Sequence, residues 1–388
     1  MKAGEVFDFD TPVNRRGTAS EKWDRYAGRD ILPLWVADMD FHSPHAVILA
    51  LHQRVEHGVF GYTSPSRELV TTVLEMLQRE YNWQVREEWL VWLPGLVCGL
   101  NVACRAVGVP GDGVATFTPV YPPFLSAPKL AGRDLVSVPL LTSGDRWQID
   151  LDALERAITP HTRLLLLCSP HNPVGRVWSR EEQLALLELA ERHDLVVCSD
   201  EIHAGLVLDK DKRHVPFAAL SADAARRTIT LQAPSKTYNI PGLGCAFAVI
   251  PDQGLRSRFR NAMAGIVPHV NLLGYAAAEV AYRDSEAWRQ VLLEYLRTNR
   301  DLVAQAIAGM PGLKTWPVEA TYLAWVDARG LGVADPAGFF EERGVGLSDG
   351  VHFGAPGFVR LNFGCPRSLL ESALERMQSA VSKHLYRS

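Results

Sequence analysis

The sequence predicts an α/β fold built from a large, doubly wound, mostly parallel sheet and a smaller α+β C-terminal part. Helix-period segments alternate with short β-rich runs from about residue 65 to 285, without internal repeats. The length of 388 residues also exceeds what a single core usually accommodates. One large and one smaller domain are therefore expected.

The alternating segments can be assigned in order along the chain. Apolar residues at helical spacing predict helices, and short β-branched apolar runs predict strands. The expected helices cover 65–81, 96–107, 151–158 and 180–193, and the expected strands cover 114–117, 164–168, 195–199 and 228–231.

A long helical pattern over 285–310 predicts the connection to the C-terminal part. In that part, the same patterns predict strands at 322–326 and 358–361 and helices at 336–343 and 367–384.

The first 45 residues are rich in turn formers and aromatic residues and show no long helical pattern. We expect them to pack on the C-terminal part. The predicted division is an N-terminal arm over 1–47, a large domain over 48–285 and a small domain over 286–388.

Composition and charge narrow the classes of function. Hydrophobic content of 47% and charged content of 22% are ordinary for a globular protein, and the net charge of −4 gives no basic surface for nucleic acid or an anionic membrane. The acidic start and the lack of long apolar runs predict neither a signal peptide nor a membrane span, and so a cytoplasmic protein. The six cysteines lack CxxC spacing, which indicates reduced core residues rather than disulfides or metal ligands.

Lys236 and Asp200 are the most informative residues of the chain. Each follows a predicted strand, so both should lie at the carboxyl edge of the sheet, where open α/β folds bind ligands. The pair suits pyridoxal phosphate (PLP), because a lysine amine forms a Schiff base with its aldehyde and a carboxylate keeps its ring nitrogen protonated. Taken singly, Lys236 could belong to a solvated turn and Asp200 could be a helix N-cap.

Two further residues stand in turn segments after predicted strands. Asn172, within Ser169 to Gly175, could donate a hydrogen bond to the phenolate oxygen of the cofactor. Tyr121, within Thr118 to Phe124, could stack on the cofactor ring. The alternatives are an ordinary Asn-Pro turn and a buried core tyrosine.

A phosphate could bind where Gly95 opens an apolar helix. The backbone N–H groups of Leu96 and Val97 would point at it together with the positive end of the helix dipole. Ser235 and Tyr62 are further candidate donors. The segment has neither the Walker pattern nor G-x-G-x-x-G spacing, which disfavours ATP and dinucleotides.

Arg360 stands inside an otherwise apolar predicted strand. A buried guanidinium needs an anion, and the carboxylate of a substrate would supply a bidentate partner. The alternative is an internal salt bridge.

Taken together, these residues make the chain resemble fold-type I PLP-dependent enzymes of the aminotransferase superfamily, and among them the MalY/PatB type of cystathionine β-lyase. The matching segments follow the family's order over nearly the whole chain. They are 35–41, 61–63, 119–124, 169–175, 199–203, 234–239, 321–325 and 360–363.

The resemblance implies a role for each site residue. It implies Lys236 as the Schiff-base lysine, Asp200 on the ring nitrogen, Asn172 on the phenolate oxygen, Tyr121 on the ring face and Arg360 on the substrate carboxylate, with Asp38 as a further substrate-binding residue. His203 stands where many aminotransferases carry a tyrosine that touches the phenolate oxygen, which is typical of the lyase group. Tyr62 would reach the phosphate of the neighbouring subunit, in an obligate homodimer with shared sites.

The implied reaction is α,β-elimination, which converts L-cystathionine or a related cysteine S-conjugate to pyruvate, ammonia and a thiol. An aminotransferase acting on an L-amino acid is the alternative, and a non-catalytic transcriptional modulator is a weaker one. Gly205, Tyr238, Ala320 and Cys245 depart from the common family residues, which are aspartate, phenylalanine, glycine and serine, respectively. These departures leave the identity of the thioether open.

Overall fold

The computed structural model describes residues 7–385, so the ends of the predicted N-terminal arm and small domain, 1–6 and 386–388, lie outside the described residues. Its large sheet is built from seven strands: β2 (Leu90–Leu93), β3 (Gly113–Thr118), β4 (Asp134–Pro139), β7 (Thr162–Cys168), β8 (Val196–Asp200), β9 (Thr228–Gln232) and β10 (Ala246–Val249). Their order is β2-β10-β9-β8-β7-β3-β4, and β10 runs antiparallel to both neighbours. The other pairs are parallel, so the prediction of a mostly parallel sheet is confirmed.

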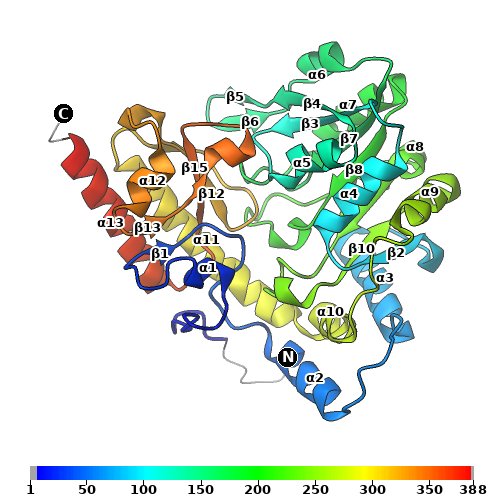
Figure 1. Cartoon of the computed structure of the whole chain (residues 1–388), viewed down its shortest axis with the longest axis horizontal. Helices are drawn as coiled ribbons and strands as arrows, with labels where there is room; N and C mark the ends of the chain where they lie inside the picture. Colours follow the sequence, from blue (N-terminus) through cyan, green and yellow to red (C-terminus); the bar gives the residue numbers. More distant parts are fainter. Residues whose placement is uncertain (1–6, 386–388) are drawn as a thin grey trace.

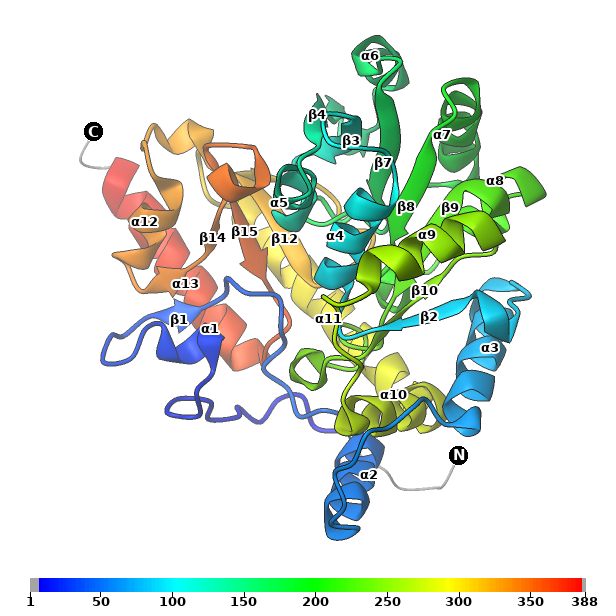
Figure 2. The same ribbon diagram turned by 45° about the vertical axis from the view of Figure 1, so that its right-hand side comes forward.

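Helices cover both faces of this sheet (Figures 1 and 2). In β7, Leu164 and Leu166 pack into the core formed with α4 (Leu96–Ala106), α5 (Pro123–Leu130) and α9 (Gln253–Met263). Leu165 and Leu167 pack into the opposite core with α6 (Leu151–Ala157), α7 (Arg180–Arg192) and α8 (Ala222–Arg227). A strand buried on both faces is apolar at every position, which explains the run of four leucines.

A second sheet has the order β11-β12-β15-β14 and is antiparallel throughout. Its strands are β11 (Lys314–Thr315), β12 (Leu323–Asp327), β14 (Ser348–Asp349) and β15 (Phe358–Asn362). The helices that accompany it are α11 (Glu286–Ala308), α12 (Pro336–Glu341) and α13 (Arg367–Leu385).

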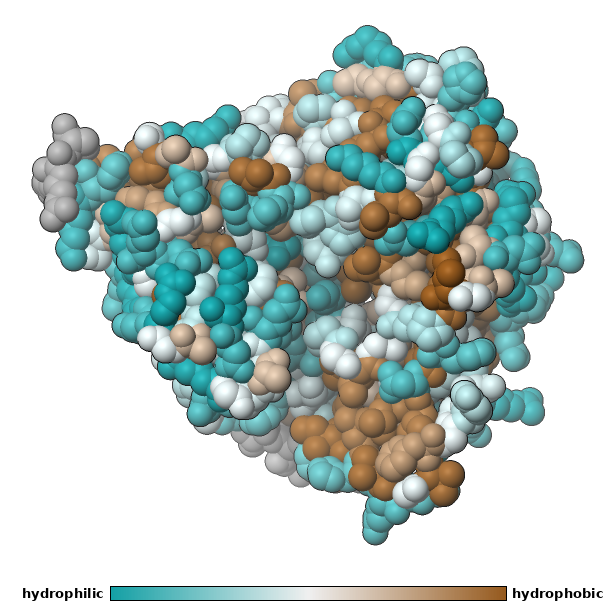
Figure 3. Space-filling view, viewed as in Figure 1, coloured by the Kyte–Doolittle hydropathy of each residue, from teal (hydrophilic) through white to brown (hydrophobic). Residues whose placement is uncertain are grey.

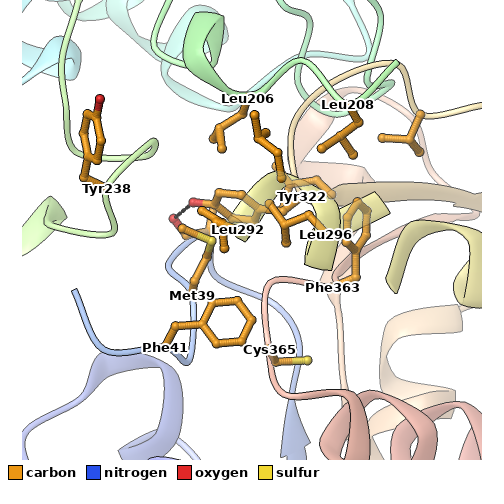
Figure 4. Packing of buried hydrophobic residues seen from close by; sticks show 14 of the residues in the cluster. Met39, Phe41, Leu206, Leu208, Tyr238, Leu292, Leu296, Tyr322, Phe363 and Cys365 are labelled. Atoms are coloured by element: carbon orange, nitrogen blue, oxygen red, sulfur yellow. Dashed lines mark hydrogen bonds between the residues drawn. The ribbon is translucent and has the colours of Figure 1, made fainter. Parts of the chain in front are cut away.

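The N-terminal segment lies against this second sheet region. Its strand β1 (Leu32–Pro33) pairs in parallel with β13 (Val345–Gly346). Figure 4 shows Met39 and Phe41 of this segment beside Leu292 and Leu296 of α11 and near Phe363. Residues at both ends of the chain therefore share one core.

The remaining elements are short or lie at the periphery. Helix α10 (Leu272–Asp284) packs on both α2 (His45–Glu56) and α3 (Arg67–Tyr81). The others are α1 (Glu21–Asp24), β5 (Leu141–Ser143), β6 (Arg146–Gln148), and the 3-10 turns η1 (Glu87–Trp89), η2 (Ala204–Leu206), η3 (Phe217–Ala219), η4 (Pro241–Leu243), η5 (Arg329–Leu331) and η6 (Gly350–Phe353).

The six cysteines are all free thiols, and all except the half-buried Cys98 are buried. This agrees with their predicted role as core residues. Within residues 7–385, no helix combines the length and the apolar character needed to cross a membrane.

Candidate active site

Six strands of the large sheet, all except β10, run in the same direction, so their carboxyl ends lie at one edge. Seven of the predicted site residues end or follow five of these strands, which places them at this edge. They are Leu96 and Val97 after β2, Tyr121 after β3, Asn172 after β7, Asp200 at the end of β8, and Ser235 and Lys236 after β9.

Lys236 lies in the loop after β9, and its amine donates a 2.6 Å hydrogen bond to the main-chain carbonyl of Ala37. Burial lowers the pKa of Lys236 to about 8; the positive charge of Arg360 also lowers it, whereas Asp38 and Asp200 act in the opposite direction. The unprotonated fraction near neutral pH is therefore much larger than for an ordinary lysine, although still the minor one, and this favours a role as nucleophile or base.

Asn239 fixes the loop that carries Lys236. Its Oδ1 accepts from the N–H of Met39 at 2.9 Å, and its Nδ2 donates to the carbonyls of Met39 and Phe41. The loop also contacts the turn after β8, because a Cβ on Gly205 would lie 2.6 Å from Oγ1 of Thr237. A side chain at position 205 would therefore require Thr237, and with it the Lys236 loop, to shift.

Asp200 is buried at the end of β8, with 5% of its surface exposed. Its Oδ1 accepts from the N–H of Ile202 at 3.1 Å, but no helix begins there, so the N-cap alternative is excluded. Burial, with a smaller contribution from the neighbouring carboxylate of Glu201, raises the pKa of Asp200 to about 7, although the N–H of Ile202 and the charge of Lys236 act in the opposite direction. A cation on a bound ligand would favour the ionised form.

Glu201 was missed by the sequence reasoning, although it adjoins Asp200. It is buried and accepts hydrogen bonds from the hydroxyl of Ser199, the main-chain N–H of Phe217, and the side chains of His214 and Gln232. These contacts hold the carboxylate of Glu201 next to Asp200. Among the described residues, it has no lysine or arginine partner. The run Asp200-Glu201 was the signal that could have revealed it.

Arg360 is 4% exposed in β15 and makes no ion pair within residues 7–385. Its guanidinium donates to Oδ1 of Asn172 at 3.1 Å and to the carbonyl of Trp35 at 2.9 Å, while Nε has no partner in this part of the chain. Burial lowers the pKa of Arg360 to about 10, so it remains a cation at neutral pH. The salt-bridge alternative is thus wrong, and a buried unpaired cation remains to bind an anion.

Asn172 and Tyr121 are joined through the backbone, because the N–H of Tyr121 donates to the carbonyl of Asn172 at 3.1 Å. Arg360 occupies Oδ1 of Asn172, which leaves Nδ2 as a donor toward a ligand. Tyr121 is half-buried, and burial raises the pKa of its phenol. It therefore stays neutral and presents an aromatic ring.

His203 is buried, and its Nδ1 has no hydrogen-bond partner among the described residues. Burial, assisted by the charges of Lys236 and Arg360, lowers the pKa of His203 to about 3. The imidazole is therefore neutral. Its ring lies edge-on to Tyr322, whose hydroxyl donates to the carbonyl of Ala37.

The N-terminal segment also brings Asp38 to the site. Its Oδ2 pairs with Arg15 at 2.5 Å, and Arg15 also binds Asp40 at 2.7 Å. The buried Lys22 contacts Asp40 at 2.7 Å. Oδ1 of Asp38 is buried without a partner in the described part of the chain, so it can accept a hydrogen bond from a ligand.

Tyr62 differs from these residues in its exposure to solvent. It lies in the extended segment between α2 and α3, and its side chain is fully exposed. The structure therefore leaves its hydroxyl available to another molecule.

Comparison with known proteins identifies the class to which this fold and site belong. Residues 29–377 match the family of class I and II aminotransferases, and the chain belongs to that family. It is similar to cystathionine β-lyase PatB of Bacillus subtilis, with 38% identity over 97% of this chain and 100% of that protein. Among solved structures, it resembles OvoB (51% identity, TM-score 0.95, 97% and 99% coverage) and the PLP-containing cystalysin of Treponema denticola (32%, 0.93, 98% and 100%).

Proposed function

We propose that the protein is a PLP-dependent carbon–sulfur β-lyase. The observation that carries the proposal is the placement of Lys236 and Asp200 at the ends of adjacent strands, where each perturbs the other's pKa. The unused groups of the site fit this cofactor. They are Oδ2 of Asp200, Nδ2 of Asn172 and the free N–H groups at the start of α4, and beside them the amine of Lys236, which has only the carbonyl of Ala37 as a hydrogen-bond partner among the described residues.

Each of these groups has a part in holding the cofactor. Lys236 would attach it covalently, Asp200 would bind the protonated ring nitrogen, Asn172 and His203 would serve the phenolate oxygen, and Tyr121 would cover the ring. The N–H groups of Leu96 and Val97 and the hydroxyl of Ser235 bind the phosphate. Bound PLP supplies an electron sink that labilises the bonds at the substrate α-carbon.

The remaining residues hold the substrate and move its proton. Arg360 binds the α-carboxylate, and the unpartnered Oδ1 of Asp38 accepts a hydrogen bond from the amino group. Once the amino group of the substrate has taken its place on the cofactor, the amine of Lys236, whose pKa burial lowers to about 8, would be free to remove the α-proton. The thiolate then leaves from Cβ, and hydrolysis of the remaining three-carbon unit gives pyruvate and ammonia. L-Cystathionine and related cysteine S-conjugates are the proposed substrates, in line with the name of the Bacillus subtilis relative.

A homodimer with shared sites completes the proposal. Hydrophobic side chains gather over α2 and α10 on the face in Figure 3, and Leu49, Val55, Val59 and Phe60 are about half exposed or more. Such a patch suits a subunit interface, and the adjoining Tyr62 would then reach the partner's phosphate site. The free thiols suit the cytoplasm. Within each subunit, we propose an N-terminal arm over 1–47, a large domain over 48–285 and a small domain over 286–388.

The reaction is tested by supplying L-cystathionine to the PLP-loaded protein without any keto acid. Steady release of pyruvate, ammonia and thiol is expected, faster than transamination of alanine or aspartate. Turnover that stops after one equivalent and resumes only with a keto acid would replace the lyase with the aminotransferase alternative.

A further inference from the structure

A cavity extends outward from Arg360 and Tyr121 and is far larger than a cysteine side chain requires. Its volume is about 880 Å³, and its walls come from α5, α12 and the segment β14–η6, with Trp35 of the N-terminal segment beside them. The N–H of Val120 donates to the carbonyl of Phe353 at 3.1 Å, which holds the start of α5 against η6. In Figure 2, α5 lies on the side of the large sheet that faces β14 and β15.

Several charged side chains line this cavity, and most already have partners. Glu341 pairs with Arg29 at 2.9 Å, and Asp335 caps the N-terminus of α12. The guanidinium of Arg25 lies 4.5 Å from the centre of the Trp35 ring. Glu341 and Asp335 therefore have partners within the protein, whereas the guanidinium of Arg25 lies against two aromatic rings and makes no hydrogen bond or ion pair with the residues in 7–385.

Lys129 and Asp349 differ from these groups. The amine of Lys129, in the last turn of α5, makes no hydrogen bond or ion pair with any residue in 7–385. Asp349 accepts from the N–H of Val351 through Oδ1 at 3.0 Å, and its Oδ2 has no partner in the same range. It is half-buried in β14, next to Ser348, which pairs with Arg360 across the sheet. A free cation and a partly used carboxylate therefore line the space into which a group on the substrate sulfur would extend.

We propose that Lys129 and Asp349 form a subsite for the leaving group and select thiols that carry both a carboxylate and an ammonium group. Lys129 binds the distal carboxylate, and Asp349 binds the distal ammonium. The inference rests on the proposed lyase function, because it concerns the part of the substrate that departs with sulfur. It assigns the choice of thioether to two residues that do not touch the cofactor.

Four conjugates separate the two contributions. S-Ethyl-L-cysteine has an uncharged leaving group, S-(2-carboxyethyl)-L-cysteine an anionic one, S-(2-aminoethyl)-L-cysteine a cationic one, and L-cystathionine a dipolar one. Each kcat/KM is measured by pyruvate release and divided by the value for S-ethyl-L-cysteine, which removes effects common to all substrates. Apparent Kd values are obtained in parallel from the change in cofactor absorbance on mixing.

Lys129→Gln is expected to lower the ratios for the carboxyethyl conjugate and for cystathionine by about 5-fold, the size of a partly exposed ion pair. Asp349→Asn is expected to lower the ratios for the aminoethyl conjugate and for cystathionine similarly, and its amide oxygen can still accept from Val351. Lys129→Glu should reverse the preference between the anionic and cationic conjugates. Lys383→Gln, which makes the same charge change on α13 away from the cavity, serves as the control.

Unchanged ratios in Lys129→Gln and Asp349→Asn, or equal changes in Lys383→Gln, would overturn the subsite. The lyase function is judged separately from S-ethyl-L-cysteine with the unaltered protein. If that substrate gives no pyruvate, the proposed lyase function is wrong. The subsite is then tested with the ratios of the Kd values, and the same changes or lack of changes in the variants support or overturn it.

Discussion

Nη1 of Arg360 donates a hydrogen bond to Oδ1 of Asn172 over 3.1 Å, although the two residues are 188 positions apart. A guanidinium can only donate, so the contact fixes the side-chain amide of Asn172 with its oxygen toward Arg360 and its nitrogen away. The residue proposed to bind the substrate therefore orients the residue proposed to bind the cofactor. Binding of the carboxylate and orientation of the cofactor depend on the same pair.

Arg360→Ala is expected to raise KM strongly for every substrate. Loss of a charge-assisted pair that leaves a buried carboxylate without a partner costs about 2–5 kcal/mol of binding. Steady-state kinetics measure the effect. The KM of Arg360→Lys, which keeps the charge but not the planar fork, should lie between the KM of the unaltered protein and that of Arg360→Ala. An unchanged KM in Arg360→Ala would show that the carboxylate binds elsewhere.

Lys236→Ala is expected to abolish turnover, because the same amine attaches the cofactor and removes the α-proton. The visible absorbance of lysine-bound PLP should disappear, and mass spectrometry after borohydride reduction should find no cofactor on the chain. Thr237→Ser, a conservative change next to Lys236, is the control. If the reduced Lys236→Ala chain still carries PLP, the lysine has been assigned wrongly.

Asp200→Asn is expected to stabilise the cofactor-free protein while it disables the enzyme. The pKa of Asp200 is raised to about 7 from an ordinary value of 3.8, so its ionised form is penalised in the folded state. This penalty is absent below about pH 4, grows as the pH rises toward 7, and is constant above it. The amide removes it and keeps the acceptor for Ile202.

Chemical denaturation of the cofactor-free protein measures this effect as a free energy of unfolding. We expect a gain on the order of 2–4 kcal/mol at pH 8 and a smaller one at pH 5. Asp145→Asn, at an exposed turn carboxylate, should change stability little at either pH. A loss of stability at pH 8 in Asp200→Asn would contradict the assigned pKa shift.

The sequence predicted which of these side chains lie at the carboxyl edge of the large sheet, because Asn172, Asp200 and Lys236 each follow or end a buried apolar strand. It did not predict β2, β4 and β10. Strands β2 and β10 have four residues each and are too short to show a period, and β4 is a largely exposed strand at the edge of the sheet. The network of Arg15, Lys22 and Asp40 was also missed. Its partners are far apart in sequence, and such ion pairs depend on tertiary contacts that local patterns do not contain.

Tyr62 provides a test of the proposed dimer. If it serves the phosphate of the partner subunit, a mixture of inactive Lys236→Ala chains and Tyr62→Ala chains should recover activity. Some mixed dimers would then contain one site free of both substitutions. Activity is measured after subunit exchange has been demonstrated by mass spectrometry of differently tagged chains. Exchange without recovery would place Tyr62 in its own subunit's site or outside the function altogether.

The segment from Trp35 to Asp38 has a consequence for how the protein is made. Nδ2 of Asn362 holds it by donating to the carbonyls of Val36 and Asp38, and Arg360 donates to the carbonyl of Trp35. The segment from Trp35 to Asp38 is synthesised more than 300 residues before its partners Arg360 and Asn362. Asp200 and Lys236 are synthesised earlier, but the segment that carries Ala37, the hydrogen-bond acceptor of Lys236, is not held in place until Arg360 and Asn362 have been made. A chain interrupted before residue 358 would therefore carry the reactive lysine without the contacts that enclose it.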